Sequence, residues 1–424
     1  MRTERPEPVF KTDPAQYNEV EKTKLAGVKA GADGAAEVFG TLMEDFRNFA
    51  SGDVGHDTEA LAKSHGIYLE YNRAKTGKEK DWMYMVRLSS PGGGPFTRKT
   101  WRVIDEISRK YTPAPGGVPS IRLTTRQNVQ FHWVKKEDLI KVVGEVAATG
   151  FLGINGCGDN TRNVMACPLS RFSTVYNAVA AAHKYGKYFE LPVAPHIQIF
   201  AIDPNVTRFD GTNIAEPRKE SFEYGPNLLN RKFKIAFTAA HRNLVTGEIE
   251  KDNCVEALTN DLSVAPIIEN GKVVAFQAYI GGGQGEKNGK STASMLGEPV
   301  AIFTPENLTK GLDSIVKVHQ EWGDRANRQW ARIKYVVWRK ASRGIRIACV
   351  SAARRSSCRT RTSTSVLARC TTAGARKRAT ASWRTGCMSS AADWSIATAR
   401  AGTTAAVRRP PPATPKSFRR SCAT

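Results

Sequence analysis

The chain has 424 residues, with 63 Lys and Arg against 40 Asp and Glu, a formal net charge of +23. A charge of this size is typical of proteins that bind nucleic acid or an acidic surface. However, residues 338–424 hold 19 of the basic residues and a single acid, Asp393, which leaves 44 basic and 39 acidic residues in 1–337. The body of the protein is therefore close to neutral, and its composition gives no reason to expect a nucleic-acid partner.

Three further features bear on the cellular compartment. The chain has no apolar run of about 18 residues, so we expect no transmembrane helix and no membrane partner. The amino terminus carries charges of both signs and lacks the apolar stretch of a secretory signal. Eight cysteines without paired spacing are typical of a reduced protein, which predicts a cytoplasmic location.

The first 150 residues divide into two predicted regions. Residues 1–66 are polar and helical in pattern, with helices expected at 34–50 and 55–65, and we interpret them as an extension that wraps the protein. Residues 67–150 alternate between strand and helix patterns and predict a small α+β domain. Its predicted elements are strands at 67–73, 82–90 and 120–134, a turn at 91–96, and helices at 97–111 and 135–150.

Residues 151–337 predict a second, α/β domain. It begins with a Gly- and Asn-rich loop at 153–168, and loops are where binding residues concentrate. The remaining predicted elements are a helix at 170–189, strands at 195–202, 231–237, 262–268 and 271–280, and a helix at 305–335.

The composition changes abruptly at Trp338. Residues 338–424, the basic tail, are rich in Ala, Arg, Ser and Thr and lack hydrophobic periodicity, so they cannot bury enough apolar surface to offset the entropy of ordering. We expect this segment to be disordered, and we interpret it as GC-rich coding sequence translated out of frame. The alternative is a natural basic arm that binds nucleic acid.

The predicted strand at 120–134 carries the most distinctive polar pattern. Side chains alternate across a strand, so one face would be polar throughout and the other largely apolar. A face that combines two arginines, amides and an imidazole, with no acid, suits the binding of carboxylates or oxyanions, although a solvated outer face is the plain alternative. The residues of this face are Arg122, Thr124, Arg126, Asn128, Gln130 and His132.

Other basic residues lie at strand and loop ends. In the segment RKFKIAF (231–237), Lys232 and Lys234 share the face opposite an apolar one, and two adjacent ammonium groups repel each other unless an anion lies beside them. Arg162 lies in the Gly/Asn loop and Arg87 ends a strand. Gly281, Gly282 and Gly283 permit the close approach of a flat ligand or form a simple turn. Together the cations indicate a polyanionic ligand.

Four of these segments resemble the sirohaem-dependent sulfite and nitrite reductase family. RLTTRQNVQFHW (122–133), GDNTRNVMACP (158–168), RKFKIAF (231–237) and the triple glycine occur in that family's order and approximate spacing. The resemblance covers about residues 60–337, the amino-terminal half of the family's chain. It implies that 67–150 is a ferredoxin-like half-domain and that 151–337 is the sirohaem-binding α/β domain.

The resemblance also implies roles for individual residues. Arg87, Arg162, Lys232 and Lys234 correspond to the family's catalytic cations, which hold the anion and help to deliver protons. The residues that correspond to its sirohaem-binding positions are Arg122, Thr124, Arg126, Gln130, His132, Asn160, Asn163, Gly281, Gly282 and Gly283. One departure is Asn230, where the family usually has a proline before RKFK.

By resemblance, the function is the six-electron reduction of sulfite to sulfide or of nitrite to ammonia, with sulfite preferred. The cofactors would be sirohaem and a [4Fe–4S] cluster, and the electron donor would be ferredoxin or a flavoprotein reductase. The family holds its cluster with a Cys-x5-Cys and a Cys-x3-Cys motif, and the eight cysteines here contain neither spacing. We therefore expect this chain to be inactive as written, and a non-catalytic tetrapyrrole- or anion-binding protein is the alternative function.

Overall fold

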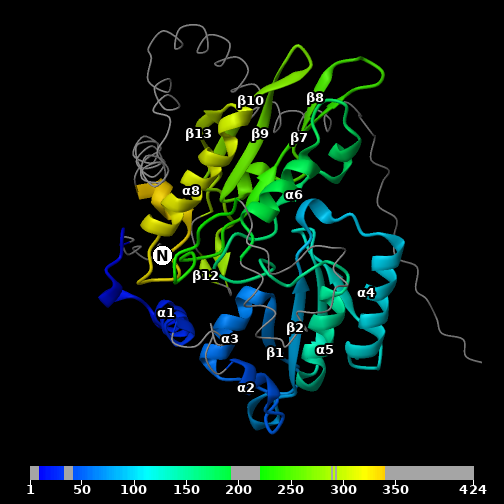
Figure 1. Ribbon diagram of the computed structural model, residues 1–424, viewed down its shortest axis with the longest axis vertical. Coiled ribbons are helices and arrows are strands. Elements are labelled where there is room, and N and C mark those ends of the chain that lie inside the picture. Colours follow the sequence, from blue (N-terminus) through cyan, green and yellow to red (C-terminus); the bar gives the residue numbers. More distant parts are fainter. Residues whose placement is uncertain (1–8, 33–41, 192–219, 288–289, 292–293, 340–424) are drawn as a thin grey trace, which may run out of the picture. The chain divides into compact units, whose positions relative to one another are not determined.

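A computed structural model describes residues 9–32, 42–191, 220–287, 290–291 and 294–339 (Figure 1). These residues form a four-stranded and a five-stranded sheet, each with helices packed on it and each with its own hydrophobic core. The predicted α+β class is confirmed. The predicted strand at 195–202 and all but the first two residues of the basic tail lie outside the described residues.

The amino-terminal segment is helical, as predicted, and contacts both sheets. Phe46, Leu61 and Ala62 join the core of the four-stranded sheet, whereas Lys24 reaches Asp159 in the loop that precedes the five-stranded sheet. Gly66 ends the 3₁₀ turn Lys63–His65, which follows the third helix, in the left-handed conformation at φ 82°. The helix predicted at 34–50 is described only from residue 42. The helices are α1 (Glu19–Ala32), α2 (Leu42–Arg47) and α3 (His56–Ala62), with 3₁₀ turns at Pro14–Gln16 and Lys63–His65.

The four-stranded sheet is antiparallel, in the order β1-β2-β4-β3, and corresponds to the predicted half-domain. Helices α4 and α5 supply Ile104, Ile107, Leu139 and Val143 to its core. The turn predicted at 91–96, which follows β2, contains a short 3₁₀ turn, η4 (Pro91–Gly93). The elements are β1 (Ile67–Tyr71), β2 (Trp82–Leu88), α4 (Arg98–Tyr111), β3 (Ile121–Leu123), β4 (Val129–Val134) and α5 (Lys136–Ala147).

The prediction of one continuous strand over 120–134 is wrong. Residues 124–128 form a tight turn between β3 and β4, and the two strands pair with each other, Arg122 opposite Gln130. The hydroxyl of Thr124 accepts hydrogen bonds from the backbone N–H groups of Arg126 and Asn128, which satisfies the turn locally. Gln127 adopts a left-handed φ of 58°. The alternation of side chains therefore breaks in the middle of the segment.

The five-stranded sheet is mixed, in the order β13-β10-β9-β6-β5. Strands β9, β6 and β5 are parallel to one another, with β5 at one edge of the sheet, and β10 and β13 are antiparallel to their neighbours. Helices α6 and α8 pack against this sheet in one large core (Figure 1). The elements are β5 (Met165–Ala166), η5 (Pro168–Phe172), α6 (Ala178–Tyr188), β6 (Ile235–Phe237), β9 (Leu262–Glu269), β10 (Lys272–Ile280), β13 (Glu298–Phe303) and α8 (Leu308–Trp322).

Two hairpins accompany the second sheet and were not predicted. β7 (Ala239–Arg242) pairs with β8 (Ile249–Asp252), and β11 (Glu286–Lys287) pairs with β12 (Lys290–Ser291). Their strands are only two to four residues long, which is too short for an alternating pattern to stand out. Short 3₁₀ turns lie at Gly77–Glu79, Ala257–Thr259 and Pro305–Asn307.

The single helix predicted over 305–335 is also wrong. Helix α8 ends at Trp322, and Gly323 is extended, at φ −70° and ψ 144°. A Cβ at position 323 would overlap the side-chain amide of Asn230, so only glycine fits here. Asp324 then accepts hydrogen bonds from the backbone N–H groups of Ala326 and Asn327, which fixes the loop before a helical turn at 333–339.

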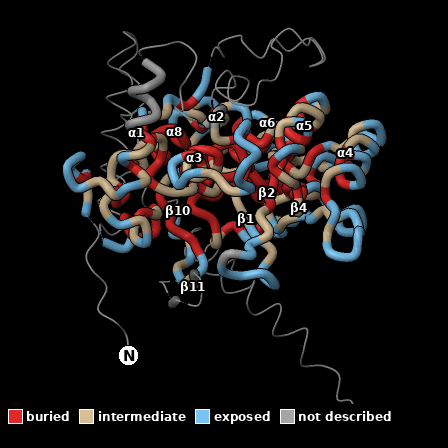
Figure 2. Tube along the Cα trace, turned by 90° about the horizontal axis from the view of Figure 1, so that it is seen from below, coloured by how far each residue is buried: buried red, intermediate tan, exposed pale blue. Residues whose placement is uncertain are grey.

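Burial follows the two cores. Figure 2 shows buried residues concentrated along the sheets and exposed residues on the outer loops and helix faces. In the described part of the chain, none of the helices has the length and apolar character that crossing a membrane requires.

Candidate anion-binding site

The loop that carries Arg162 lies beside the segment that carries the two lysines, which leads into β6 and is a regular strand only from Ile235. The N–H of Arg162 donates to the carbonyl of Phe233 at 2.7 Å, and the N–H of Phe233 donates to the carbonyl of Asn160 at 3.0 Å. The ring of Phe233 is fully buried in the core. Because side chains alternate along an extended segment, Lys232 and Lys234 point away from that core, on the side where the loop places its arginine.

Arg87 comes to the same place from β2. Its Nη1 donates to the carbonyl of Gly156 at 3.1 Å, and Nη1 of Arg162 donates to the same carbonyl at 3.2 Å. Nε of Arg162 also binds the carbonyl of Gly158 at 3.0 Å. Gly158 has a φ of 88° and lies against Ser64, so the loop needs glycine there to present both carbonyls. One carbonyl thus holds two guanidinium groups together.

The two lysines are partly buried and lie near other cations. Burial, followed by the charges of Arg162 and Lys234, lowers the pKa of Lys232 to about 7. Burial, followed by Arg126 and Arg332, lowers the pKa of Lys234 to about 8, against a partial opposing effect of Asp261. The charge of Arg162 lowers the pKa of both lysines, so the loop and the strand form one electrostatic cluster.

The acids nearest to this cluster are bound to other cations. Asp261 pairs with Arg332 at 2.8 Å, and its second oxygen accepts the backbone N–H of Lys234 at 2.9 Å. Asp159 pairs with Arg328 at 2.6 Å and with Lys24 at 3.2 Å. Within the described residues, the ammonium groups of Lys232 and Lys234 have no acceptor. The cluster therefore has a surplus of positive charge that an anionic ligand would neutralise.

Arg126 lies at the edge of the cluster, and the N–H groups of its guanidinium donate to other groups of the protein. Its guanidinium binds the carbonyls of Asn163 and Ile235, both at 2.8 Å, and the side-chain oxygen of Asn260 at 2.7 Å. Burial lowers its pKa to about 9. In the structure, Arg126 joins the β3–β4 turn to the five-stranded sheet and the hydroxyl of Thr124 satisfies that turn, while their correspondence to sirohaem-binding positions stays a prediction.

The remaining polar residues of β3 and β4 form a separate group. His132 contacts Glu70 at 3.2 Å and the amide of Gln130 at 3.4 Å. When its amide oxygen faces β2, Gln130 accepts a hydrogen bond from Nε of Arg87 at 2.8 Å. The pKa of Glu70 is lowered mainly by its hydrogen bond with His132. The positive charge of Arg122, which is exposed, lowers that pKa further. Glu70 supplies the acid that the predicted polar face lacked.

The two asparagines of the loop behave differently. Asn163 is satisfied by the protein, because its amide binds the carbonyls of Ser90 and Arg126. Asn160 is fully buried, and among the described residues neither atom of its side-chain amide has a partner. A buried amide without a partner is costly, so Asn160 is a position where a ligand or a water molecule would be stabilising.

The three glycines approach protein atoms closely. A Cβ on Gly281 would lie 2.8 Å from Val337, and one on Gly283 would lie 2.9 Å from the guanidinium of Arg332. A Cβ on Gly282 would overlap the carbonyl of Leu258. Because these glycines have no side chains, the segment that follows β10 can pack directly against the 257–260 turn, and the guanidinium of Arg332 can lie beside Gly283 where it pairs with Asp261. The predicted approach of a flat ligand to these glycines stays a prediction.

Sequence reasoning missed several neighbours of the cluster. The phenol of Tyr68 contacts the thiol of Cys157, and burial raises the pKa of Tyr68. The guanidinium of Arg87 lies over the Tyr68 ring, 5.8 Å from its centre. Arg231 and Arg332 add further positive charge beside Lys232. Only Arg231 stood within a motif, and neither Tyr68 nor Arg332 shows a spacing that predicts its place.

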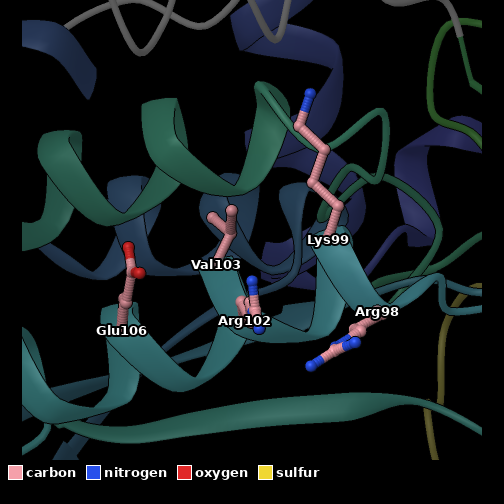
Figure 3. A pocket seen from close by; sticks show the side chains of 5 residues that line it. All are labelled: Arg98, Lys99, Arg102, Val103 and Glu106. Atoms are coloured by element: carbon pink, nitrogen blue, oxygen red, sulfur yellow. The ribbon is translucent and has the colours of Figure 1, made fainter.

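Two surface hollows differ in their relation to this site. One of about 180 Å³ lies beside the loop and includes Asn155, Arg162 and Asn163 in its lining. A larger, shallow one of about 510 Å³ lies along the exposed face of α4 (Figure 3). No predicted site residue lines the larger hollow, so its size does not mark it as the site. Its lining residues are Arg98, Lys99, Arg102, Val103 and Glu106.

Arg87 on the half-domain and Arg162 on the loop before the α/β sheet share the carbonyl of Gly156, so both parts of this α+β protein contribute cations to one cluster. Residues 76–149 match the family described as "Nitrite/Sulfite reductase ferredoxin-like half domain". Residues 157–350 match the family described as "Nitrite and sulphite reductase 4Fe-4S domain". The chain belongs to the nitrite and sulfite reductase family.

Similar proteins agree with this assignment. The chain is 31% identical over 309 residues to the "Sulfite reductase [NADPH] hemoprotein beta-component" of Geobacillus thermodenitrificans, and 30% identical over 307 residues to that of Shewanella sp. strain ANA-3. Each match covers 70% of this chain and 50% of the relative, so the chain spans about half the length of these curated relatives.

The fold is similar to that of the Mycobacterium tuberculosis NirA protein. The TM-score is 0.55 at 16% identity, over 80% of this chain and 53% of NirA. At this identity the similarity supports the fold, and it agrees with the predicted ferredoxin-like half-domain.

Proposed function

We propose that this chain supplies the sirohaem- and anion-binding part of a sulfite or nitrite reductase, with sulfite as the preferred substrate. The observation that carries the proposal is the surplus of positive charge where the loop with Arg162 meets the strand with Lys232 and Lys234. The names of the curated relatives, "Sulfite reductase [NADPH] hemoprotein beta-component", favour sulfite over nitrite and a reductase partner as electron donor.

The residues of the site fit sirohaem, a macrocycle rich in carboxylates. Arg87 and Arg162 present guanidinium groups, which bind carboxylates through paired hydrogen bonds. The partly buried ammonium groups of Lys232 and Lys234 and the unpartnered amide of Asn160 offer further donors. When bound, sirohaem would supply the iron through which electrons pass to the anion.

The chain's own residues then have two tasks. The cations lower the free energy of a small oxyanion in the site, because charges that are already desolvated interact strongly with it. Lys232 and Lys234 also hold exchangeable protons with a pKa of about 7 and about 8. A group whose pKa lies near the operating pH both donates and regains a proton readily, and each sulfite reduced to sulfide consumes protons.

The described residues do not fit a [4Fe–4S] cluster. Such a cluster takes four thiolates. The described part of the chain holds Cys157, beside Tyr68, and the pair Cys167 and Cys254, which lie together elsewhere. We therefore propose that this chain binds its macrocycle but does not reduce sulfite, and that the electron donor, ferredoxin or a flavoprotein reductase, has no cluster here to which it can pass electrons.

Reconstitution tests this proposal. The purified chain is titrated with sirohaem and then assayed with reduced methyl viologen and sulfite. We expect a saturable change in the sirohaem absorption spectrum with about one equivalent bound, together with no sulfide production above the protein-free control. Sulfide production by the chain would contradict the inactivity, and the absence of saturable binding would contradict the proposed function itself.

The lysine pKa values predict a pH dependence of anion binding. Between about pH 6 and about pH 9 both ammonium groups lose their protons, since their pKa values are about 7 and about 8. The site then carries less positive charge, and we expect the affinity for sulfate, whose own charge is constant in this range, to fall about tenfold. Isothermal titration calorimetry measures it. The Lys232→Met variant should show weaker binding and a flatter profile; an affinity of the unmodified chain that does not change with pH would contradict the assignment.

A further inference from the structure

A second cluster of polar side chains lies apart from the anion-binding residues, where β5 meets the β7–β8 hairpin. Cys167 follows β5, His241 lies on β7, Asp252 ends β8, and Cys254 comes two residues later. The ligand atoms of Cys167, Asp252 and Cys254 all lie within 4.8 Å of one another. The sequence distances of 74 and 85 residues that separate Cys167 from His241 and Asp252 explain why no motif revealed this group.

The hairpin register brings the histidine and the carboxylate to one face. Ala239 pairs with Asp252 and His241 pairs with Glu250, so His241 and Asp252 are diagonal neighbours on the same side of the two strands. Nε2 of His241 lies 3.3 Å from Oδ2 of Asp252 and 4.0 Å from Sγ of Cys167. Sγ of Cys167 lies 2.7 Å from the same carboxylate oxygen.

The carboxylate is held in place by the turn that follows it. Its other oxygen, Oδ1, accepts the backbone N–H of Cys254 at 2.7 Å, which leaves Oδ2 facing the sulfur and the imidazole. The same turn carries the Cys254 side chain back toward Cys167. Cys167 is buried, whereas Cys254 is exposed and the side chains of His241 and Asp252 are about a third and a quarter exposed. The cluster is therefore anchored on one side and open to solvent on the other.

The geometry points to a zinc site formed by Cys167, His241, Asp252 and Cys254. Two sulfurs, an imidazole nitrogen and a carboxylate oxygen are the donors that Zn²⁺ takes in a tetrahedral site. With Zn–S bonds of about 2.3 Å and Zn–N or Zn–O bonds of about 2.0–2.2 Å, neighbouring ligand atoms lie about 3.3–3.8 Å apart. The separations in the structure are 2.7 Å between Sγ of Cys167 and Oδ2 of Asp252, 3.3 Å between Oδ2 and Nε2 of His241, and 4.0 Å between Nε2 and Sγ. These values lie around that range, so small side-chain rotations would complete the site.

A zinc ion here would have a structural role. It would join β5, which belongs to the five-stranded sheet, to the β7–β8 hairpin, which is a separate two-stranded sheet. A two-stranded hairpin is marginal in water without such support. The zinc site shares no residue with the anion-binding cluster, so its test does not depend on the proposed function.

Metal analysis of the full chain tests the site. Protein purified under reducing conditions is equilibrated with Zn²⁺, freed of unbound metal and analysed by inductively coupled plasma mass spectrometry. We expect Cys167→Ser and His241→Gln each to bind about one zinc ion fewer than the unmodified chain. The histidine variant is included because a partly exposed side chain can be replaced without disturbing the core. The matched control is Cys157→Ser, which removes a buried thiol outside the cluster and should retain the full amount.

Cobalt provides the second readout. Co²⁺ bound to thiolates has a charge-transfer band in the near ultraviolet, which should be present in the unmodified chain and in Cys157→Ser and should be weaker in Cys254→Ser. The five cysteines beyond residue 339 are common to all variants, so they cancel in the comparison. An equal zinc content in all variants would overturn the site. A Cys167–Cys254 disulfide in protein that takes up no zinc at these residues would overturn it as well.

Discussion

Replacing Arg162 with methionine is expected to weaken the binding of sirohaem to this chain about 100-fold. Burial is the main cause of the lowered pKa of Lys232 and of Lys234, and the positive charge of Arg162 lowers both further, so Arg162 lies within electrostatic reach of both lysines. Its loss removes a charge-assisted hydrogen bond to a carboxylate, worth about 2–3 kcal/mol, and about 2.7 kcal/mol corresponds to a 100-fold change in the dissociation constant. Absorption titration measures the effect.

Two further variants separate charge from folding. Arg162 also donates to the carbonyls of Gly156 and Gly158, so its removal disturbs the loop as well as the charge. Arg162→Lys keeps the charge and should recover part of the affinity. Arg98→Met removes an exposed arginine of α4, in the hollow of Figure 3, and should bind like the unmodified chain.

The pKa of Lys232 gives an independent readout. Because Arg162 lowers this pKa, the Arg162→Met variant should titrate Lys232 above about 7, which shifts the pH profile of sulfate binding upward even as the affinity falls. An unchanged midpoint would show that the charge of Arg162 does not act on Lys232. That outcome would count against the central role of Arg162.

Replacing Glu21 with glutamine is expected to lower the free energy of unfolding by about 3–5 kcal/mol. The carboxylate of Glu21 is fully buried. It accepts hydrogen bonds from Nη1 of Arg325 at 2.5 Å, from Nζ of Lys24 at 2.8 Å and from the amide of Asn227 at 2.9 Å. Glutamine has the same size as glutamate but no negative charge, so it no longer neutralises the buried cations Lys24 and Arg325. Removing one partner of a buried ion pair costs about 3–5 kcal/mol.

Glu19, on the same helix, provides the matched control. Its carboxylate is 79% exposed and pairs with Lys22 at 2.8 Å. Exposed pairs of this kind contribute about 0–1 kcal/mol, so Glu19→Gln should unfold at nearly the same urea concentration as the unmodified chain. Equal stability of the two variants would show that α1 is not docked through Glu21 in solution.

The docking of α1 has a consequence for the site. Lys24 and Arg328 both bind Asp159, which lies in the same loop as Arg162. Burial alone would raise the pKa of Asp159, but these two cations hold it well below its usual range. The amino-terminal helix therefore helps to fix the loop that presents the arginine, which is a task the sequence pattern of a polar extension did not reveal.

Local sequence patterns predicted some of these features well. The segment RKFKIAF was predicted to bury one face, and Phe233, Ile235 and Phe237 are all fully buried, with the two lysines on the other side. This prediction worked because the alternation of apolar and charged residues is itself the physical cause of the strand's orientation. The helix at 97–111 was predicted for the same kind of reason, since Ile104 and Ile107 are buried.

Other features depend on contacts between distant residues. The turn at 124–128 interrupts an alternating pattern through the hydroxyl of Thr124, and nothing in the alternation marks that break. The end of α8 depends on Asn230, which occupies the space where a side chain at position 323 would be. The hydrogen bonds of Arg126 with Asn163 and Asn260 also join residues far apart in the sequence, and its role toward sirohaem stays a prediction.

The central claim is that guanidinium and ammonium groups from separate strands and a loop converge on the carboxylates of one macrocycle. The most direct measurement compares the affinity of the chain for sirohaem with its affinity for the same macrocycle after its carboxylates have been esterified. We predict that esterification weakens binding at least about 100-fold and removes most of its dependence on ionic strength. Equal affinity for the two forms would contradict the claim, because binding would then depend on the apolar ring and not on the charges.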